Sequence, residues 1–387
     1  MKTLLTLSLV MVVALCSGSA LAFHDGGVAY CAGCHTMHNS QDGVAIDGLV
    51  TNSNLLNEND ATEACLRCHA SYGQFADGNG WGAGGDFYWV TKTFTWESHG
   101  TKTSTGDSHG HNVISPGRGL NPEATLARAP GGGSAGFQSA YMACTSCHDP
   151  HGNTNFRLLY GETTIAGPGE PDTPRPNYDG GGFNFTEPAP LAAGNSRYTN
   201  RTSSRGEPET DSAHTVYKSG MSEWCANCHT NFHDDNATDF VHPVSEEMNG
   251  LAANYNAYVA TSDFSGVAAT SYSGLVPFED VDVDLTTVDT ENYTAGPTSN
   301  DQVMCLSCHR AHATPFADAT RWDMATDFLV DSHPAVAGED ELGNPIFDGG
   351  ATQSDIDNMY YGYSFTNDQR SLCNKCHVKD FGDAGNG

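Results

Sequence analysis

Cys31-Ala-Gly-Cys34-His35 is the first of six copies of the pattern Cys-x-x-Cys-His in this chain of 387 residues. The other five copies are Cys65-Leu-Arg-Cys68-His69, Cys144-Thr-Ser-Cys147-His148, Cys225-Ala-Asn-Cys228-His229, Cys305-Leu-Ser-Cys308-His309 and Cys373-Asn-Lys-Cys376-His377. A chain of this composition would contain roughly 0.02 copies by chance. The pattern is therefore the feature around which the chain is organised.

Cys-x-x-Cys-His is the attachment site of c-type haem. The two thiols bond to the haem vinyl groups, and the adjacent imidazole becomes one axial ligand of the iron. The sequence thus predicts six covalently bound haem c groups, with all twelve motif cysteines as attachment points. The predicted proximal iron ligands are His35, His69, His148, His229, His309 and His377.

Zinc sites, dithiol redox centres and local disulfides fit the pattern less well than haem does. A zinc site gathers four ligands and does not require a histidine directly after the second cysteine on every occasion. A thioredoxin-like centre has one Cys-x-x-Cys in a βαβ context, not six copies. Disulfides within each motif would close short loops that constrain the chain little.

The first 22 residues have the pattern of a secretory signal peptide. Lys2 is followed by an apolar stretch over residues 4–15 and by the small-residue site Ala20-Leu21-Ala22. Cys16 lies inside this signal, so every cysteine of the mature chain belongs to a haem motif. No other stretch has the roughly 20 apolar residues of a membrane span. We therefore expect a signal peptide at 1–22, a single exported unit at 23–387 and no membrane span.

The net charge of −30 excludes nucleic acid as the ordinary partner, because no basic stripe is available to contact phosphates. Such a surface favours cationic partners. Basic redox proteins and exposed metal ions, such as those of metal oxides, both fit this expectation.

Glycine and proline account for 43 and 17 residues, and long Gly-, Asn-, Ser- and Thr-rich runs separate the motifs. Chain of this kind offers little periodic apolar surface to offset its ordering entropy. We therefore expect an irregular, coil-dominated multihaem cytochrome c, with few short helices and minor β-strand, wrapped around a row of six haems. Each motif is predicted to form a helical turn.

Several local elements are predicted from the pattern of residues. Helices are expected over 245–259, with Ser245 as N-cap, and over 315–328. Strands are expected over 87–96 and 281–287, and ordered coil over 165–206. The tyrosines at 360–363 are expected to pack against haem or to form a subunit contact rather than to take part in chemistry. The motif starts are 34, 79, 81, 80 and 68 residues apart. The three similar middle spacings are either a coincidence or a much-diverged duplication.

The sixth iron ligand decides between electron transfer and small-molecule chemistry, because only an open iron binds a substrate. Four motifs have a second histidine three or four residues after the first, namely His38, His151, His233 and His312. At this spacing both imidazoles lie on one side of a helical turn, so the second cannot reach the far face of its own haem. It is predicted to ligate the iron of a neighbouring haem instead.

Two further distal ligands must come from the remaining histidines, His24, His99, His109, His111, His214, His242 and His333. His111 and His242 are the preferred candidates, with His24 in reserve. Since histidines are in surplus, we expect paired imidazoles and low potentials rather than methionine ligation.

Whole phrases of the sequence are similar to a known family. FHDGGVAYCAGCHTMHNS at 23–40, GGDFYWVTKTFTW at 84–96, GMSEWCANCHTNFH at 220–233, CLSCHRAHA at 305–313 and LCNKCHVKD at 372–380 resemble the filament-forming hexahaem cytochromes of Geobacter-type metal-reducing bacteria. The resemblance runs from end to end, although the loops at 160–215 and 330–355 differ.

The resemblance implies that all six haems have two histidine ligands and that subunits polymerise head to tail. It implies distal ligation by His38, His111, His151, His233, His242 and His312, with His38 reaching a haem of the adjacent subunit. The function it implies is not enzymatic but long-range extracellular electron transfer, with redox partner cytochromes and metal oxides such as iron(III) minerals as partners. A monomeric periplasmic or outer-membrane electron shuttle is the alternative from the residues alone. A multihaem oxyanion reductase fits less well, because it needs an open iron and a positive pocket.

Overall fold

A computed structural model of the chain describes the residues that form and surround the motifs. The described residues are 31–36, 40–41, 44–45, 55–70, 75, 83–97, 101–133, 136–162, 183–195, 209–232, 244–257, 275–326, 329, 332, 360 and 371–377. The predicted signal peptide at 1–22 lies outside them. Among the described residues, no helix has the length and apolar character needed to cross a membrane.

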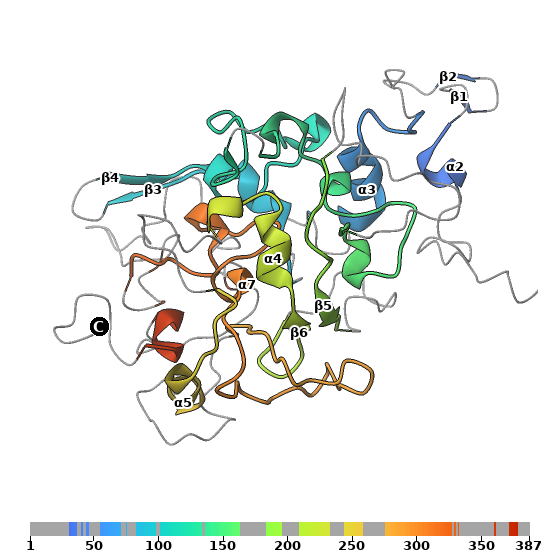
Figure 1. Cartoon of the computed structure of the whole chain (residues 1–387). Helices are drawn as coiled ribbons and strands as arrows, with labels where there is room; N and C mark the ends of the chain where they lie inside the picture. The colour runs from blue at the N-terminus through green and yellow to red at the C-terminus, as the bar shows by residue number, and fades with distance from the viewer. Residues whose placement is uncertain are drawn as a thin grey trace, which may run out of the picture.

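Regular elements are short, and most of the described chain is coil and turn (Figure 1). The helices are α2 (Cys31–Cys34), α3 (Ala61–His69), α4 (Met221–Ala226), α5 (Gly250–Ala257) and α7 (Cys305–Cys308). The strands are β1 (Ser40–Gln41), β2 (Val44–Ala45), β3 (Phe94–Glu97), β4 (Thr101–Ser104), β5 (Leu191–Ala193) and β6 (Val216–Ser219). They pair as three antiparallel two-stranded sheets, β1-β2, β3-β4 and β5-β6. The coil-dominated fold expected from the composition is confirmed.

Single 3-10 turns supply much of the remaining structure. They are η2 (Phe87–Thr91), η3 (Gly106–Ser108), η4 (Pro116–Arg118), η6 (Ser139–Tyr141), η7 (Cys144–Ser146), η8 (Phe156–Leu158), η10 (Thr230–Phe232), η11 (Ala317–Ala319) and η13 (Leu372–Lys375). Two of these turns, η7 and η13, contain cysteines of haem motifs. The expectation that each motif forms a helical turn is therefore met by α-helix in some copies and by 3-10 helix in others.

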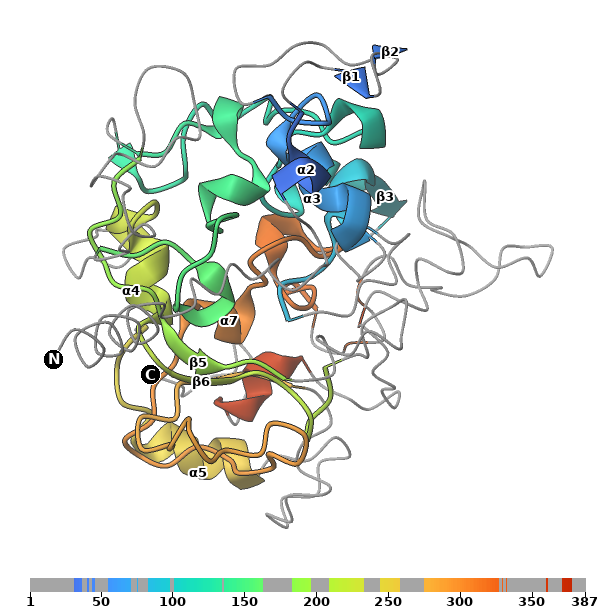
Figure 2. The same ribbon diagram turned by 90° about the vertical axis from the view of Figure 1, so that its right-hand side faces the viewer.

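The motif-bearing elements extend through the length of the molecule. In both views α2 and α3 lie at the top, α4 and α7 in the middle, and the red turn η13 lower down near α5 (Figures 1 and 2). Elements that carry consecutive motifs pack together, since α3 contacts η7 and α4 contacts α7. The fold thus arranges the motifs in sequence order.

Among the residues that the structure describes, the apolar core forms four small clusters rather than one. The largest contains Met248, Tyr255 and Trp322, and the partly buried Cys308, Cys373 and Cys376 pack against it. Another is built on Met221, Met304 and Leu306 and contacts Cys225. Apolar side chains therefore gather around the attachment cysteines, as expected for a chain folded around cofactors.

The third and fifth motifs are copies of one local structure. His148 forms an isolated antiparallel bridge with Leu159, and His309 forms the same bridge with Thr320. In both copies a residue with positive φ, Arg157 at 51° and Asp318 at 58°, turns the chain back towards the motif. These equivalent positions are all 161 residues apart.

The helices preceding these two motifs are equivalent as well. The Cys65 thiol of α3 is in hydrogen-bonding contact with Cys144, and the Cys225 thiol of α4 makes the same contact with Cys305. Ser222 Oγ, three residues before Cys225, accepts a hydrogen bond of 3.2 Å from the Cys305 backbone N–H. Thr62, three residues before Cys65, contacts Cys144 through its hydroxyl. The equal spacing in the sequence therefore marks a repeated two-motif unit rather than a coincidence.

The strand predicted over 87–96 is only partly correct. The Asp86 carboxylate accepts a hydrogen bond of 2.8 Å from the Tyr88 N–H and so caps the 3-10 turn η2. The strand begins only at Phe94, where β3 pairs with β4. The coil predicted over 165–206 is wrong at β5, which pairs with β6. Residues 165–182 and 196–206 lie outside the described part.

The helix predicted over 315–328 is wrong. Asp318 and Ala319 have positive φ values of 58° and 54°, so that only the turn η11 forms. Ala319 O accepts the Arg310 N–H at 2.8 Å, which ties this segment to the fifth motif.

The strand predicted over 281–287 is also wrong, because the Asp280 and Asp284 carboxylates accept backbone N–H groups two residues on and form turns.

The helix predicted over 245–259 is confirmed only from Gly250 to Ala257. Ser245 has a φ of 63°, and its N–H bonds to Val303 O at 2.8 Å, so it pairs with another segment instead of capping the helix. Tyr360 packs within the protein, because its ring contacts two core clusters and its hydroxyl donates to Leu329 O at 2.7 Å. Its contact with haem or with another subunit stays a prediction. The other tyrosines of that group lie outside the described residues.

Candidate haem-binding site

Each attachment motif closes into one helical turn. In five of the six, the backbone N–H of the motif histidine donates to the carbonyl of the first cysteine, at 2.8 Å for His35 and 3.0 Å for His148, His229, His309 and His377. His69 is the last residue of α3. This turn places the two cysteines and the histidine along one side of the backbone, as attachment to a single macrocycle requires.

The proximal imidazoles are oriented by backbone carbonyls. His148 Nδ1 bonds to Arg157 O at 2.8 Å, and His309 Nδ1 bonds to Asp318 O at 2.7 Å. His229 Nδ1 bonds to Pro130 O at 2.8 Å. Because a carbonyl oxygen only accepts, Nδ1 must carry the proton in each ring. Nε2 is then left with its lone pair, the form in which histidine ligates a metal.

Three pairs of predicted ligands face each other across the fold. The ring centroids of His35 and His151 are 6.3 Å apart, with their planes at 24°. Those of His111 and His229 are 6.1 Å apart, and those of His148 and His312 are 6.2 Å apart. Each pair joins a motif histidine to a histidine predicted as a distal ligand.

These separations fit one iron between each pair of rings. A nitrogen–metal bond of about 2.0 Å on each side, with the ring centroid about 1.1 Å beyond the nitrogen, gives a centroid separation of about 6.2 Å. Direct stacking of two imidazoles would bring them much closer. The residues present therefore fit an iron held axially by two imidazoles.

The electrostatics of these rings also suit ligation. Burial, together with the neighbouring His111, lowers the pKa of His229 to about 4. Burial likewise lowers the pKa of His312 to about 3 and that of His111 below its ordinary value. These imidazoles are neutral at physiological pH, so protons do not compete with iron for Nε2.

The distal histidines His111 and His312 lie on two paired segments. The His111 N–H donates to His312 O at 2.9 Å, and His111 Nδ1 bonds to Ala311 O at 2.5 Å. Gly110 permits this close approach, because a Cβ there would lie 2.1 Å from His312 O. The His312 ring stacks on Phe87 with centroids 4.7 Å apart. One pairing of backbones thus positions the candidate ligands of two sites.

Two surplus histidines have other roles. His109 is fully buried, with Nε2 bonded to Ser104 Oγ at 2.7 Å and Nδ1 to Trp89 O at 2.9 Å, so that both ring nitrogens are occupied. His214 is buried, and its Nδ1 bonds to Thr215 O at 2.8 Å. The predicted ligands His38, His233 and His242 and the reserve His24 lie outside the described residues, as do His99 and His333.

Consecutive motifs are close enough for their thiols to interact. The pKa of Cys34 is raised by burial and then by Cys65 and Cys68 of the second motif. Cys147 of the third motif likewise contributes to the raised pKa of Cys225 in the fourth motif. Cys373 and Cys376 of the sixth motif contribute in the same way to the raised pKa of Cys308 in the fifth motif. Together with the direct contacts of Cys65 with Cys144 and of Cys225 with Cys305, these interactions link all six motifs in chain order.

Most of the thiols whose pKa is shifted lack the character of a dithiol redox centre. Burial raises the pKa of Cys147 and of Cys308 to about 12, whereas reactive redox cysteines have a lowered pKa. The pKa is lowered at Cys65 and Cys305, where the first cause is contact with a cysteine of a neighbouring motif rather than with the second cysteine of the same motif. Within the described ranges, no three His, Cys, Asp or Glu side chains gather in an arrangement that could hold a metal ion. Six of the described histidines instead form three pairs, and two imidazoles are what a haem iron with both axial positions filled by histidine takes from a protein.

Some residues that shape the site were missed by sequence reasoning. The carbonyls of Arg157 and Asp318, which orient two proximal histidines, each lie nine residues after the histidine they contact. Comparison of the third and fifth motifs at their common offset would have aligned these positions. Pro130 O, by contrast, lies 99 residues from His229 and has no signal in the sequence.

The motifs form turns suited to haem attachment, and backbone carbonyls orient several of their imidazoles. Further imidazoles face three of the motif histidines at a separation that fits one iron between the rings. These features define this chain as a multihaem c-type cytochrome. A family model for a doubled CXXCH motif matches residues 138–167. The C-type cytochrome OmcS of Geobacter sulfurreducens is 34% identical over 94% of this chain and 95% of that protein. The chain therefore belongs to the OmcS family.

Solved structures agree with this assignment. A cryo-EM structure of the OmcS nanowires from Geobacter sulfurreducens superposes with a TM-score of 0.72 at 30% identity, covering 92% of this chain and all of that one. A structure of the outer membrane cytochrome S filament from the same organism gives a TM-score of 0.68 at 29% identity, with the same coverage.

Proposed function

We propose that this protein is an exported electron carrier that holds six haem c groups and polymerises head to tail into a conducting filament. The observation that carries the proposal is the set of three imidazole pairs, 6.1–6.3 Å apart, on motifs that contact one another in chain order. Haem iron, when bound, supplies one-electron chemistry by cycling between the ferric and ferrous states. Every other part of the function comes from how the chain holds the sites.

The proposed iron ligands follow from the pairs. His151 serves the site of His35, His312 serves that of His148, and His111 serves that of His229. The sites of His69, His309 and His377 take their distal ligands from His38, His233 and His242, with His24 in reserve. With two protein ligands at every iron, no position is open for a substrate, and we propose no enzymatic activity.

The repeat supports a specific role for His38. His151, three residues after the third motif histidine, faces the first site, and His312, at the same position after the fifth, faces the third site. Each odd-numbered site thus receives a histidine from the next odd-numbered motif. The fifth site has no later copy in its own chain, so the series continues with His38 of the partner subunit, which occupies the same position after the first motif.

A ligand supplied in this way makes the contact between subunits heterologous. Such a contact generates an open filament when the rotation does not close a ring. The two filamentous relatives support this assembly, as each is described as a nanowire or a filament. Coordination at the junction would also keep the row of sites continuous from one subunit to the next.

The destination of the electrons follows from export and charge. A chain that loses residues 1–22 on secretion and carries a net charge of −30 would act outside the cell and favour cationic partners. We propose basic redox cytochromes and extracellular acceptors such as iron(III) oxides as its partners.

The test is imaging of the secreted protein by electron microscopy, with and without the substitution His38→Ala. The proposal predicts filaments for the wild type, and monomers with one high-spin haem for the variant. His109→Gln is the matched control. Because the His109 ring is bonded to Ser104 and Trp89, this substitution should leave the filaments intact. Wild-type protein that stays monomeric would instead indicate a soluble electron shuttle.

A further inference from the structure

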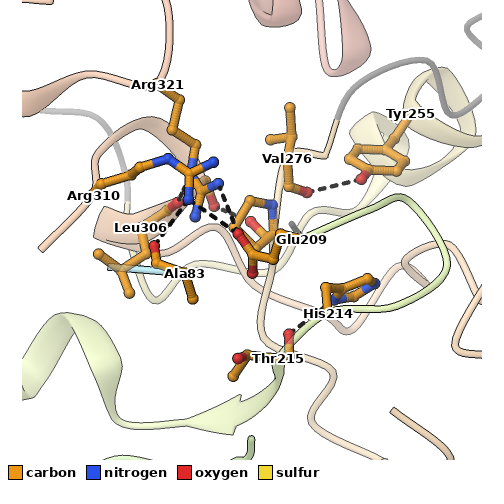
Figure 3. A network of polar contacts seen from close by, with 11 residues as sticks. Ala83, Glu209, His214, Thr215, Tyr255, Val276, Leu306, Arg310 and Arg321 are labelled. Atoms are coloured by element: carbon orange, nitrogen blue, oxygen red, sulfur yellow. Dashed lines mark hydrogen bonds and ion pairs between the residues drawn. The ribbon is translucent and has the colours of Figure 1, made fainter. Parts of the chain in front are cut away.

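A cluster of charged side chains is buried beside the fifth haem motif. The Glu209 carboxylate is fully buried and lies 3.1 Å from Arg310 Nη1 and 3.7 Å from Arg321 Nη1. Both arginine side chains are nearly inaccessible and point to Glu209 from separate segments (Figure 3). Removing charges from water is costly, and a buried ion pair often stabilises a fold no better than apolar residues of similar size. Stability alone therefore does not account for the cluster.

Both arginines lie against the fifth motif, one next to it in the sequence and the other through hydrogen bonds. Arg310 is the residue after His309, and its guanidinium also donates to Ala83 O at 3.1 Å. Arg321 Nε donates to Leu306 O at 2.7 Å, and its backbone N–H donates to Cys308 O at 2.8 Å. The positive charges are thus held against the segment that would carry the haem.

The repeated unit shows that the local fold does not require arginine at these positions. In the third motif the equivalent residues are Asp149 and Tyr160. The Asp149 N–H bonds to Leu158 O at 2.8 Å, and the Tyr160 N–H bonds to Cys147 O at 3.0 Å, which are the bonds that Arg310 and Arg321 make. The backbone is the same in both copies, but the buried charge beside the motif is reversed at the first position and added at the second. A third equivalent pair, Arg157 and Asp318, reverses the charge in the opposite sense, but both side chains are exposed and therefore screened by solvent.

We propose that Arg310 and Arg321, with Glu209 between them, set the reduction potential of the fifth site and raise it above that of the third. This inference rests on the proposed function as an electron carrier. Reduction moves one electron from a neighbouring site in the row, which is oxidised, and involves no proton. The charge of the fifth site falls by one, so nearby positive charge stabilises its reduced form and nearby negative charge destabilises it. In a buried environment this interaction is only weakly screened.

The test is spectroelectrochemical titration of the complete haem-loaded protein. Arg321→Gln should shift one of the six components to lower potential, and Glu209→Gln should shift the same component to higher potential. Arg321→Lys keeps the positive charge and should restore most of the wild-type value. Lys102→Gln is the control, because Lys102 lies exposed on β4 and outside every haem motif, so its removal should shift no component appreciably.

Potential shifts of opposite sign in Arg321→Gln and Glu209→Gln distinguish a charge effect from a loss of packing. A loss of packing would shift the potential in the same direction in both variants. Shifts of equal sign, no shift, or an Arg321→Lys variant that behaves like Arg321→Gln would overturn the inference. If Arg321→Gln fails to fold, Glu209→Gln and Arg321→Lys still decide the question. A wild-type protein without six low-spin haems would instead contradict the proposed function, so the two failures are distinguishable.

Discussion

His35 and His151 face each other with ring centroids 6.3 Å apart and planes at 24°, although they belong to the first and third haem motifs. His151 lies three residues after His148, the histidine of its own motif, yet the ring of His148 faces His312, which follows the fifth motif. The segment from His148 to His151 therefore contributes one imidazole to each of two pairs. A short peptide that serves two irons holds their macrocycles close together, as a conducting row requires.

Replacement of His151 by alanine should leave the haem at His35 with one axial ligand. We expect one haem in six to become high-spin in the oxidised protein and to bind carbon monoxide when reduced, which absorption and electron paramagnetic resonance spectra would detect. His109→Gln, which removes a buried imidazole bonded only to protein groups, should leave all six haems low-spin. A His151→Ala protein whose six haems all remain low-spin would rule out this pairing.

Replacement of Gly110 by alanine should disturb two sites at once. The new Cβ would lie 2.1 Å from His312 O and 2.6 Å from the Ala313 Cα, so that the paired segments must separate. Strain of this kind costs roughly 1–3 kcal/mol. We expect partial loss of distal ligation by both His111 and His312, seen as high-spin signal from two haems.

Gly250 provides the comparison for that substitution. It begins α5, and a Cβ there would meet nothing within 4 Å. Gly250→Ala should leave the spectrum unchanged and stabilise the protein by about 0.4–1 kcal/mol, because it restricts only the unfolded chain. Equal spectral effects of the two alanine variants would show that Gly110 does not position the ligands.

The sequence was sufficient to predict the helical turns of the motifs and the coil-dominated fold, because each depends on a local pattern. It also predicted that His151 and His312 pair with histidines outside their own motifs, as their rings do. The partners of these rings depend on contacts across the whole chain, such as the pairing of His111 with His312 O, and no local pattern encodes them. The helix expected over 315–328 failed for the same reason, since that segment bonds to Arg310 and Cys308 of the fifth motif.

Glu279 should make the stability of the protein depend on pH. Burial raises its pKa to about 7 from an ordinary value of 4.5; the nearby Glu223 also raises it, while the hydrogen bond from the Met221 N–H opposes the shift. Because the pKa of Glu279 is higher in the folded state, its protonation stabilises the folded state, and this contribution is fully present below about pH 4.5. This contribution is lost as the pH rises through about 7, and the gap corresponds to about 3 kcal/mol.

Glu279→Gln tests this dependence, because glutamine keeps an acceptor for the Met221 N–H but does not ionise. We expect the variant to be more stable than the wild type at about pH 8 and to match it closely at about pH 5. The measurement is the midpoint of unfolding in denaturant at the two pH values. A difference between the proteins that does not change with pH would show that Glu279 has the same pKa in the folded and unfolded states.

The central claim is that paired imidazoles hold a continuous row of haems that passes from one subunit to the next. A cryo-EM reconstruction of the secreted, assembled protein tests it most directly. We predict one iron between the rings of each pair, His35 with His151, His148 with His312 and His229 with His111, and density joining His38 of the partner subunit to the iron at His309. Isolated subunits, or irons at these three sites bound by other residues, would contradict the claim.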